Sequence, residues 1–303
     1  MVLAADVKNV SKKYGSQDAL RDLSFSVNSG EIFGLVGPDG AGKTTTLRIL
    51  STAISPTSGT ASVFDFDVVS REEQVKDYIG YMPQVFALYE DLTLEENIDF
   101  YADLYLVDGS LLKEKKEDLL KSLGLERFRK RQAGKLSGGM KKKLALACTL
   151  IHSPRLLILD EPTTGVDPLS RREFWRMLYS LVPEVTIVIS TPYMDEAERC
   201  NRVGLIYNGA LKLVDEPTKI LDKISGEILE LKCQDIRGAK KLLIEKTGIK
   251  NAEIFGDSIH VLLDSYEQDS PRVKEVLDSG GVKDYSLRKI PPKLEDVFVS
   301  ILK

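Results

Sequence analysis

The sequence contains few of the residues that build disulfide frameworks or metal clusters. It has only 3 cysteines and 2 histidines among 303 residues. Cys148, Cys200 and Cys233 form no Cys-x-x-Cys pair with histidine partners at zinc-site spacing. An odd number of such isolated cysteines is typical of reduced thiols in a cytoplasmic protein. We therefore expect structural thiols rather than a disulfide scaffold.

Long apolar runs are also absent. No segment approaches the roughly 18 consecutive apolar residues that a membrane-spanning helix needs. The first residues, MVLAADVKNVSKKYG, lack the apolar stretch of a signal peptide. If the protein serves a membrane, we expect the spanning part to be another chain.

Charge of one sign is not in large excess. The formal net charge is −4, whereas a dominant nucleic-acid surface is normally basic. This balance argues against nucleic acid as a partner, although it leaves room for a local basic patch.

The length predicts two domains, on the basis of about 150 residues each. Short apolar runs alternate with helical segments over the first 220 residues or so, which favours an α/β fold with a largely parallel sheet. Such runs also suit buried helices, but their β-branched content favours strands. The predicted strands include Ile32–Val36, Leu156–Leu159, Val185–Ser190 and Val203–Tyr207.

Between Gln84 and Ile151 the pattern becomes helical, with Leu, Glu and Lys at spacings of three to four residues. Glu95–Tyr105 and Lys113–Leu123 are the clearest examples. We expect a helical insert at about residues 85–151, within a first domain of residues 1–222.

The remaining residues, 223–303, predict a second domain with the order βαββαβ, which is the ferredoxin-like arrangement. Asp257 lies in the expected turn between the two middle strands, and a short helix ends the chain. The predicted elements are strand Glu227–Cys233, helix Arg237–Thr247, strands Ala252–Phe255 and Ser258–Leu263, helix Pro271–Ser279, strand Lys283–Arg288 and helix Leu294–Leu302.

The strongest motif is a glycine-rich loop from Gly37 to Gly42, followed by Lys43 and Thr44, which matches G-x-x-x-x-G-K-[ST]. It follows a predicted strand and precedes a predicted helix (Thr45–Ser51), as a P-loop must. Glycines let the backbone N–H groups turn inward around phosphates, and the helix N-terminus adds partial positive charge. Lys43 supplies a full charge to the β- and γ-phosphates, and the Thr44 hydroxyl suits Mg²⁺. The alternative is a flexible glycine turn without a ligand.

A second motif is the apolar strand that ends in Asp160 and Glu161. A strand tip is rigid, so it can hold Asp160 near a metal and Glu161 near an attacking water. Apolar strands that end in acidic residues are common, but beside a P-loop this pair is the expected second half of a nucleotide site.

A third motif, Ser137-Gly138-Gly139, directly precedes a predicted helix (Lys141–Ile151). It predicts a second phosphate-binding helix end. One nucleotide does not need two such ends from one chain, so a dimer in which each Ser-Gly-Gly end closes over the partner's P-loop would explain it. Ordinary capping of the helix by Ser137 remains the alternative.

In this order the motifs resemble those of the ABC (ATP-binding cassette) ATPases, over about residues 2–220. The resemblance implies an α/β P-loop NTPase cassette, a RecA-like core plus the helical insert, here followed by the small α+β ferredoxin-like domain. It implies ATP hydrolysis, with ATP and Mg²⁺ as cofactors. The implied nucleotide-contacting residues are Tyr14, Gly37, Pro38, Asp39, Gly40, Ala41, Gly42, Lys43, Thr44, Thr45, Ser137, Gly138, Gly139 and Asp167.

The resemblance also implies individual roles. Tyr14 would stack on adenine, and Glu161 would be the base that polarises water. Gln84, in Tyr-Met-Pro-Gln, would reach the metal and sense a membrane partner, while Asp167 would lie in the D-loop at the dimer interface. The implied catalytic residues are Glu161, Lys43, Gln84 and Asp160, and the implied metal ligands are Thr44, Gln84 and Asp160.

Two positions depart from the family pattern. Met140 replaces the usual glutamine of the signature motif, past the phosphate-facing end. Pro192 replaces the usual histidine that contacts the γ-phosphate, and proline offers neither a side-chain donor nor an N–H. Losing one transition-state donor can lower the rate by roughly 10²–10³-fold. Turnover would then be slow, unless a neighbour such as Thr191 substitutes or the histidine is dispensable.

A single cassette whose C-terminal domain ends like residues 292–298 is similar to the ATPase subunits of drug and antibiotic exporters. The resemblance implies a separate membrane permease, a second copy of the cassette or a related one, and a cytoplasmic location on the inner face of the membrane. The exported compounds would be drugs or other small hydrophobic molecules. The apolar residues proposed to take a permease helix, or else to form core of the insert, are Phe86, Leu88, Tyr89 and Leu92.

Other ABC machines fit less well. Chromosome-maintenance ATPases carry a long coiled coil between the two halves of the site, but no sustained heptad run separates Gln84 from Ser137. Translation-associated members carry two cassettes in one chain. A soluble ABC ATPase, or a slow nucleotide-sensing subunit suggested by Pro192, remains the alternative.

Overall fold

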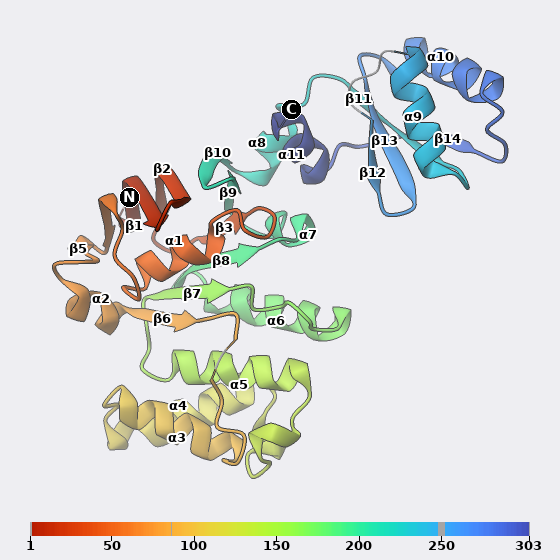
Figure 1. The fold of residues 1–303 in the computed structure, drawn as a ribbon. Helices are drawn as coiled ribbons and strands as arrows, with labels where there is room; N and C mark the ends of the chain where they lie inside the picture. Colours follow the sequence, from red (N-terminus) through yellow and green to blue (C-terminus); the bar gives the residue numbers. More distant parts are fainter. Residues whose placement is uncertain (1, 86, 248–251, 303) are drawn as a thin grey trace. The chain divides into compact units, whose positions relative to one another are not determined.

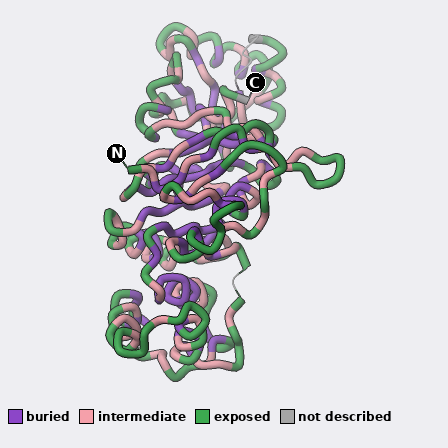
Figure 2. The backbone as a smooth tube through the Cα atoms, turned by 90° about the vertical axis from the view of Figure 1, so that its left-hand side faces the viewer, coloured by how far each residue is buried: buried purple, intermediate pink, exposed green. Residues whose placement is uncertain are grey.

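The structure is a computed structural model that describes residues 2–85, 87–247 and 252–302. The chain divides into two compact units, residues 1–214 and 215–303. Each unit has its own hydrophobic core, and Figure 2 colours the buried residues purple along the backbone. Figure 1 gives the element labels used below.

The centre of the first unit is a six-stranded sheet of order β10-β9-β3-β8-β7-β6. The pairings β9–β3, β3–β8, β8–β7 and β7–β6 are parallel. All residues of β3 and β7 are buried, which explains their uninterrupted apolar sequences. The strands are β3 (Ile32–Val36), β6 (Ile79–Met82), β7 (Leu156–Asp160), β8 (Thr186–Thr191), β9 (Arg202–Tyr207) and β10 (Ala210–Asp215). The predicted α/β core is therefore confirmed.

A second, antiparallel sheet of order β2-β1-β4-β5 belongs to the same unit. Sequence analysis did not anticipate it. Phe25 of β2 stacks on Phe33 of β3, with ring centroids 5.2 Å apart. Its strands are β1 (Leu3–Tyr14), β2 (Gln17–Asn28), β4 (Ser58–Val63) and β5 (Phe66–Asp67).

Helices complete the first unit. Thr93 and Glu96 form a reciprocal capping box at the start of α3, while Asp167 caps α6, which has Pro168 in its first turn. In the predicted insert α3 packs against α5, and both lie beyond the parallel sheet in Figure 1. The helices are α1 (Lys43–Leu50), α2 (Glu72–Tyr78), α3 (Leu94–Leu104), α4 (Gly109–Ser122), α5 (Gly138–Leu150), α6 (Pro168–Leu181) and α7 (Met194–Ala197), with short 3₁₀ turns at Glu126–Phe128 and Ala133–Lys135.

The second unit contains the predicted βαββαβ order. Its four strands form one antiparallel sheet of order β12-β13-β11-β14, which is the ferredoxin-like strand order. Helix α10 begins at Tyr266, earlier than the predicted Pro271, which lies inside it. The elements are α8 (Pro217–Leu221), β11 (Glu227–Lys232), α9 (Ile236–Thr247), β12 (Ala252–Phe255), β13 (Ser258–Leu263), α10 (Tyr266–Ser279), β14 (Ser286–Ile290) and α11 (Leu294–Leu302).

Candidate functional site

The glycine-rich loop connects β3 to α1 at the carboxyl edge of the parallel sheet. Gly40 and Gly42 adopt φ values of 76° and 111°, in the region that favours glycine. A Cβ on Gly37 would lie only 2.2 Å from the Ile206 carbonyl oxygen. The loop therefore keeps its curvature only with glycine at these positions, as a phosphate-binding nest requires.

Lys43 begins α1, and its ammonium turns back into this loop. Its Nζ donates to the carbonyl oxygens of Gly37 at 2.9 Å and Pro38 at 3.1 Å. It also lies 3.1 Å from Glu161 Oε1. Lys43 is only 4% exposed, so this charge is desolvated and balanced by a carboxylate.

Asp160 ends β7 and is 1% exposed. Its Oδ1 accepts hydrogen bonds from Thr44 Oγ1 at 3.1 Å and from Ser190 Oγ at 2.6 Å. A hydroxyl and a carboxylate at this separation offer the oxygen ligands that Mg²⁺ prefers. Among the described residues no cluster of three or more His, Cys, Asp or Glu suits a metal ion. The donor set therefore fits a metal held by one or two protein oxygens together with substrate phosphates.

Glu161 follows directly and has a positive φ of 46°, a strained conformation often found at functional sites. Its backbone N–H donates to Ser190 Oγ at 3.0 Å. Its Oε2 accepts from Gln84 Nε2 at 3.1 Å and from Thr164 Oγ1 at 3.3 Å. In this arrangement the Gln84 amide faces Glu161, so the structure does not show the predicted metal contact of Gln84.

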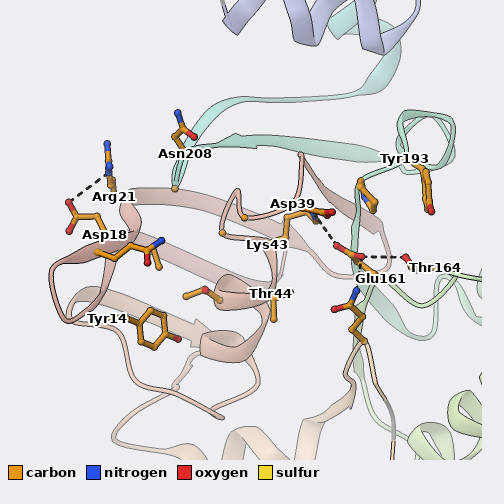
Figure 3. Close-up of a pocket in the computed structure, with 18 of the residues that line it drawn as sticks. Tyr14, Asp18, Arg21, Asp39, Lys43, Thr44, Glu161, Thr164, Tyr193 and Asn208 are labelled. Carbon is orange, nitrogen blue, oxygen red and sulfur yellow. Dashed lines mark hydrogen bonds and ion pairs between the residues drawn. The ribbon is translucent and has the colours of Figure 1, made fainter. Parts of the chain in front are cut away.

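Lys43, Thr44 and Glu161 line a cavity of about 880 Å³, a size suited to a nucleotide (Figure 3). Tyr14 stands at the end of β1, half-exposed, and contributes an aromatic wall. The predicted site residues that line the cavity are Tyr14, Asp39, Gly40, Gly42, Lys43, Thr44, Thr45, Gln84 and Glu161. Gly37, Pro38, Ala41 and Asp160 lie in the adjoining loop and strand end without lining it.

Sequence analysis missed the outer wall of the cavity. This wall consists of the β1–β2 connection at Ser16, the first part of β2 up to Arg21, and the turn between β9 and β10 at Asn208 and Gly209. Gly209 N–H donates to the Ala41 carbonyl at 2.9 Å, and its own carbonyl accepts from Arg21 N–H at 2.7 Å. The Asn-Gly pair between two apolar runs was a hairpin signal that could have revealed this turn.

The predicted signature residues lie elsewhere. Ser137 caps α5, where its Oγ accepts from Met140 N–H at 3.3 Å. Within the described part of the chain, Ser137, Gly138, Gly139 and Asp167 do not line the cavity. Ser137 therefore caps α5, as the alternative interpretation expected, and a cap of this kind is compatible with contact to a partner's nucleotide.

The structure shows where Pro192 and its neighbour Thr191 lie relative to the cavity. Pro192 lines the cavity, but the Thr191 hydroxyl does not. Thr191 Oγ1 donates to Glu196 Oε2 at 2.7 Å and accepts from Tyr193 N–H at 3.0 Å. Glu196 is fully buried, and its other oxygen accepts from Thr163 Oγ1 at 2.5 Å. Thr191 is thus engaged away from the nucleotide cavity.

A groove of about 300 Å³ lies beside the cavity, between the segment after β6 and the start of α5. Val85 and Leu88 line it, and nearby Tyr89 is exposed. Lys142 also lines it and donates to the Gln84 carbonyl at 3.1 Å. Burial lowers the pKa of Lys142, although the carboxylates of Asp160 and Glu161 oppose this effect. Phe86, also predicted here, lies outside the described residues.

Comparison with known proteins identifies the family. The family model described as ABC transporter matches residues 20–164. A Nod factor export ATP-binding protein I of Burkholderia orbicola is 35% identical over 99% of this chain and 97% of its own length. The chain belongs to the ABC transporter family of ATP-binding proteins.

One further relative and one solved structure agree with this assignment. It is 39% identical, over 98% of its length, to YbhF of Escherichia coli, named as a probable multidrug ABC transporter ATP-binding protein, but it spans only 51% of that relative. The dimeric structure of a post-hydrolysis state of the ATP-binding cassette MJ0796, bound to ADP and Pi, matches with a TM-score of 0.64 and 26% identity, over 70% of this chain and 98% of the other. ABC cassettes thus form dimers, and this chain has the cassette fold with an additional C-terminal antiparallel sheet domain.

None of the helices in the described ranges has the length and apolar character needed to cross a membrane.

Proposed function

We propose that this chain is the ATP-hydrolysing subunit of an ABC exporter. The observation that carries the proposal is that Lys43, Thr44 and Glu161 line one cavity of nucleotide size, with Asp160 hydrogen-bonded to Thr44 behind its wall. The relative named as a Nod factor export ATP-binding protein supports transport outward, and the relative named as a probable multidrug ABC transporter ATP-binding protein supports a role in transport. We infer that the exported compounds are drugs or other small hydrophobic molecules.

In the proposed mechanism, Lys43 and the P-loop N–H groups bind the ATP phosphates. Thr44 and Asp160 would hold Mg²⁺, and Gln84 would join them after leaving Glu161. When bound, the ion neutralises charge that develops on the transferred phosphoryl group. Glu161 accepts a hydrogen bond from the attacking water and orients it toward the γ-phosphate.

We infer that turnover is slow, because the cavity wall at Pro192 supplies no donor to the γ-phosphate. The Thr191 hydroxyl does not replace it, since Glu196 already accepts its proton. A missing donor of this kind lowers rates by roughly 10²–10³-fold. A slow nucleotide-sensing subunit, not dedicated to transport, is the alternative that Pro192 favours.

We infer that two cassettes join, either two copies of this chain or this chain and a related one. Ser137, Gly138, Gly139 and Asp167 do not line the cavity of their own chain. In the proposed dimer they would contact the nucleotide of the partner. Within its own chain's cavity, Tyr14 would stack on the adenine.

A separate transmembrane permease is the second proposed partner. The groove lined by Val85 and Leu88, with Tyr89 exposed nearby, would take a helix of the permease. The cassette would then lie on the cytoplasmic, inner face of the cell membrane. We assign residues 1–222 to this nucleotide-driven function and residues 223–303 to an accessory domain.

The deciding experiment is Mg²⁺-dependent ATP turnover by the purified chain beside its Glu161→Gln variant. Turnover in the original chain that disappears in the variant supports the proposal. ATP binding without turnover in either, also when the chain is reconstituted with its co-purified permease, would favour the nucleotide-sensing alternative.

A further inference from the structure

Thr164 stands in the turn that follows β7, three residues after Glu161. Its N–H donates to the Glu161 carbonyl at 3.2 Å, so the turn returns the chain toward the residue it has just left. Its hydroxyl donates to Glu161 Oε2 at 3.3 Å, the contact drawn as a dashed line in Figure 3. One residue thus restrains both the backbone and the carboxylate of Glu161.

Gln84 reaches the same carboxylate oxygen from a different part of the fold. Its Nε2 lies 3.1 Å from Glu161 Oε2, and it follows β6 rather than β7. Both Gln84 and Thr164 line the nucleotide cavity, and both also line the neighbouring groove. Together they form the wall between these two spaces, with the carboxylate of Glu161 fixed on the cavity side.

The other carboxylate oxygen has a less permanent partner. Glu161 Oε1 pairs with Lys43, the cation that the phosphates of ATP would attract. Once Lys43 turns to the phosphates, the orientation of Glu161 depends on the donors to Oε2. Pro192, which also lines the cavity, offers no donor, and Thr191 is bound to Glu196.

We propose that Thr164 is a positioning residue, whose hydroxyl holds Glu161 Oε2 in the orientation that ATP hydrolysis needs. This inference rests on the proposed hydrolytic function. Gln84 shares the oxygen but can turn toward a metal, whereas the Thr164 side chain is short and its turn is fixed by its own backbone hydrogen bond. Thr164 therefore keeps the base in place throughout the cycle.

The test compares steady-state ATP turnover by the full chain with that of Thr164→Val and Thr164→Ser. Valine has the shape of threonine without the hydroxyl, so it removes the hydrogen bond to the charged carboxylate while keeping the volume of the side chain. We expect Thr164→Val to lower kcat by on the order of 10-fold or more, with KM for ATP changed less than about twofold. Thr164→Ser retains the donor and should restore kcat to within about threefold of the original chain. Thr218→Val, an exposed threonine in the second unit, is the matched control.

The split between kcat and KM separates positioning from general damage, because a misfolded site would also lose ATP affinity. An unchanged kcat in Thr164→Val, beside an inactive Glu161→Gln, would overturn this inference alone. Equal losses in the valine and serine variants would also overturn it, since the hydroxyl would then not matter. Absence of turnover in the original chain, alone and with its permease, would contradict the proposed function, and this inference would fall with it.

Discussion

The ammonium of Lys43 lies 3.1 Å from Glu161 Oε1, and the two residues are 4% and 7% exposed. The cation that the P-loop offers to phosphates is thus paired with the proposed base. A buried ion pair is costly to break when only one partner is removed, because the other charge stays desolvated. ATP would replace the carboxylate with phosphate oxygens and release Glu161 for its own role.

This pairing predicts an unusual stability profile for Glu161→Gln. Without nucleotide, we expect the variant to lose about 1–3 kcal/mol of unfolding free energy, because Lys43 loses its carboxylate. With saturating ATP and Mg²⁺ the phosphates should compensate Lys43, and the difference from the original chain should disappear. Melting temperatures measured with and without ATP test this, with the exposed Glu184→Gln as control. An equal deficit in both conditions would contradict the pairing.

A second prediction concerns the donor that the cavity lacks. Pro192 lines the site, so Pro192→His would place an imidazole where the family resemblance implies a histidine. We expect kcat for ATP to rise by on the order of 10-fold or more, because one transition-state donor has that effect or a larger one. Pro192→Ala introduces no side-chain donor and should show no gain. If both variants behave alike in steady-state kinetics, proline does not limit the rate.

Thr191 provides the complementary prediction. Thr191→Val would leave Glu196 Oε2 buried without its hydroxyl donor, at a cost of about 1–3 kcal/mol in unfolding free energy. Because this hydroxyl does not face the cavity, kcat should change less than about threefold while urea stability falls. Thr191→Ser should retain both properties. A large loss of kcat with unchanged stability would instead return Thr191 to the catalytic site.

Strands β3 and β7 could be predicted because each is a short, fully buried apolar run followed directly by site residues. The roles of Ser190 and Thr164 could not. Ser190 bonds Asp160 only because β7 and β8 pair in one register. Thr164 meets Glu161 only because the turn after β7 folds back. Such contacts depend on tertiary approach rather than on local pattern.

The boundaries of the cavity show the same limit. Arg21 and Asn208 lie outside the P-loop motif and carry no phosphate-binding signature. They reach the cavity because the β9–β10 turn packs against Ala41 and Arg21.

In the second unit, the helix was predicted to begin at Pro271, and proline suits a first turn. The helix instead begins at Tyr266, and the absent N–H of Pro271 is accommodated inside it.

His152 predicts a pH dependence for the first unit. Its ring stacks on Tyr105 with centroids 3.9 Å apart, and Nε2 donates to the Ile79 carbonyl at 2.8 Å. Burial lowers the pKa of His152 below its ordinary value of 6.5. Below pH 6.5 the unfolded chain therefore binds a proton that the folded chain resists, so stability should fall as the pH drops below 6.5.

Urea unfolding at pH values above and below 6.5 measures this effect. His152→Gln keeps a donor for the Ile79 carbonyl but does not titrate, so it should remove part of the acid-side loss. Identical pH profiles for the original chain and the variant would show that other groups cause the loss.

The last prediction concerns the second unit, where His260 of β13 and Asp296 of α11 are both buried. His260 Nδ1 lies 2.7 Å from Asp296 Oδ1, while Asp296 Oδ2 accepts from Lys293 N–H at 2.8 Å. The pair ties the final helix to the sheet. We expect Asp296→Ala to destabilise this unit by about 1–3 kcal/mol, because the histidine loses its buried partner.

Amide hydrogen exchange is the appropriate measurement, because it resolves stability segment by segment. In Asp296→Ala, exchange should accelerate in α11 and in β13, while β3 and β7 of the cassette keep their protection. Asp264→Ala removes an exposed carboxylate and serves as control. Asp296→Asn retains an oxygen acceptor and should lie between the two. Faster exchange confined to α11 would mean that the helix contributes little to the sheet beneath it, and that the His260–Asp296 contact only anchors the chain end.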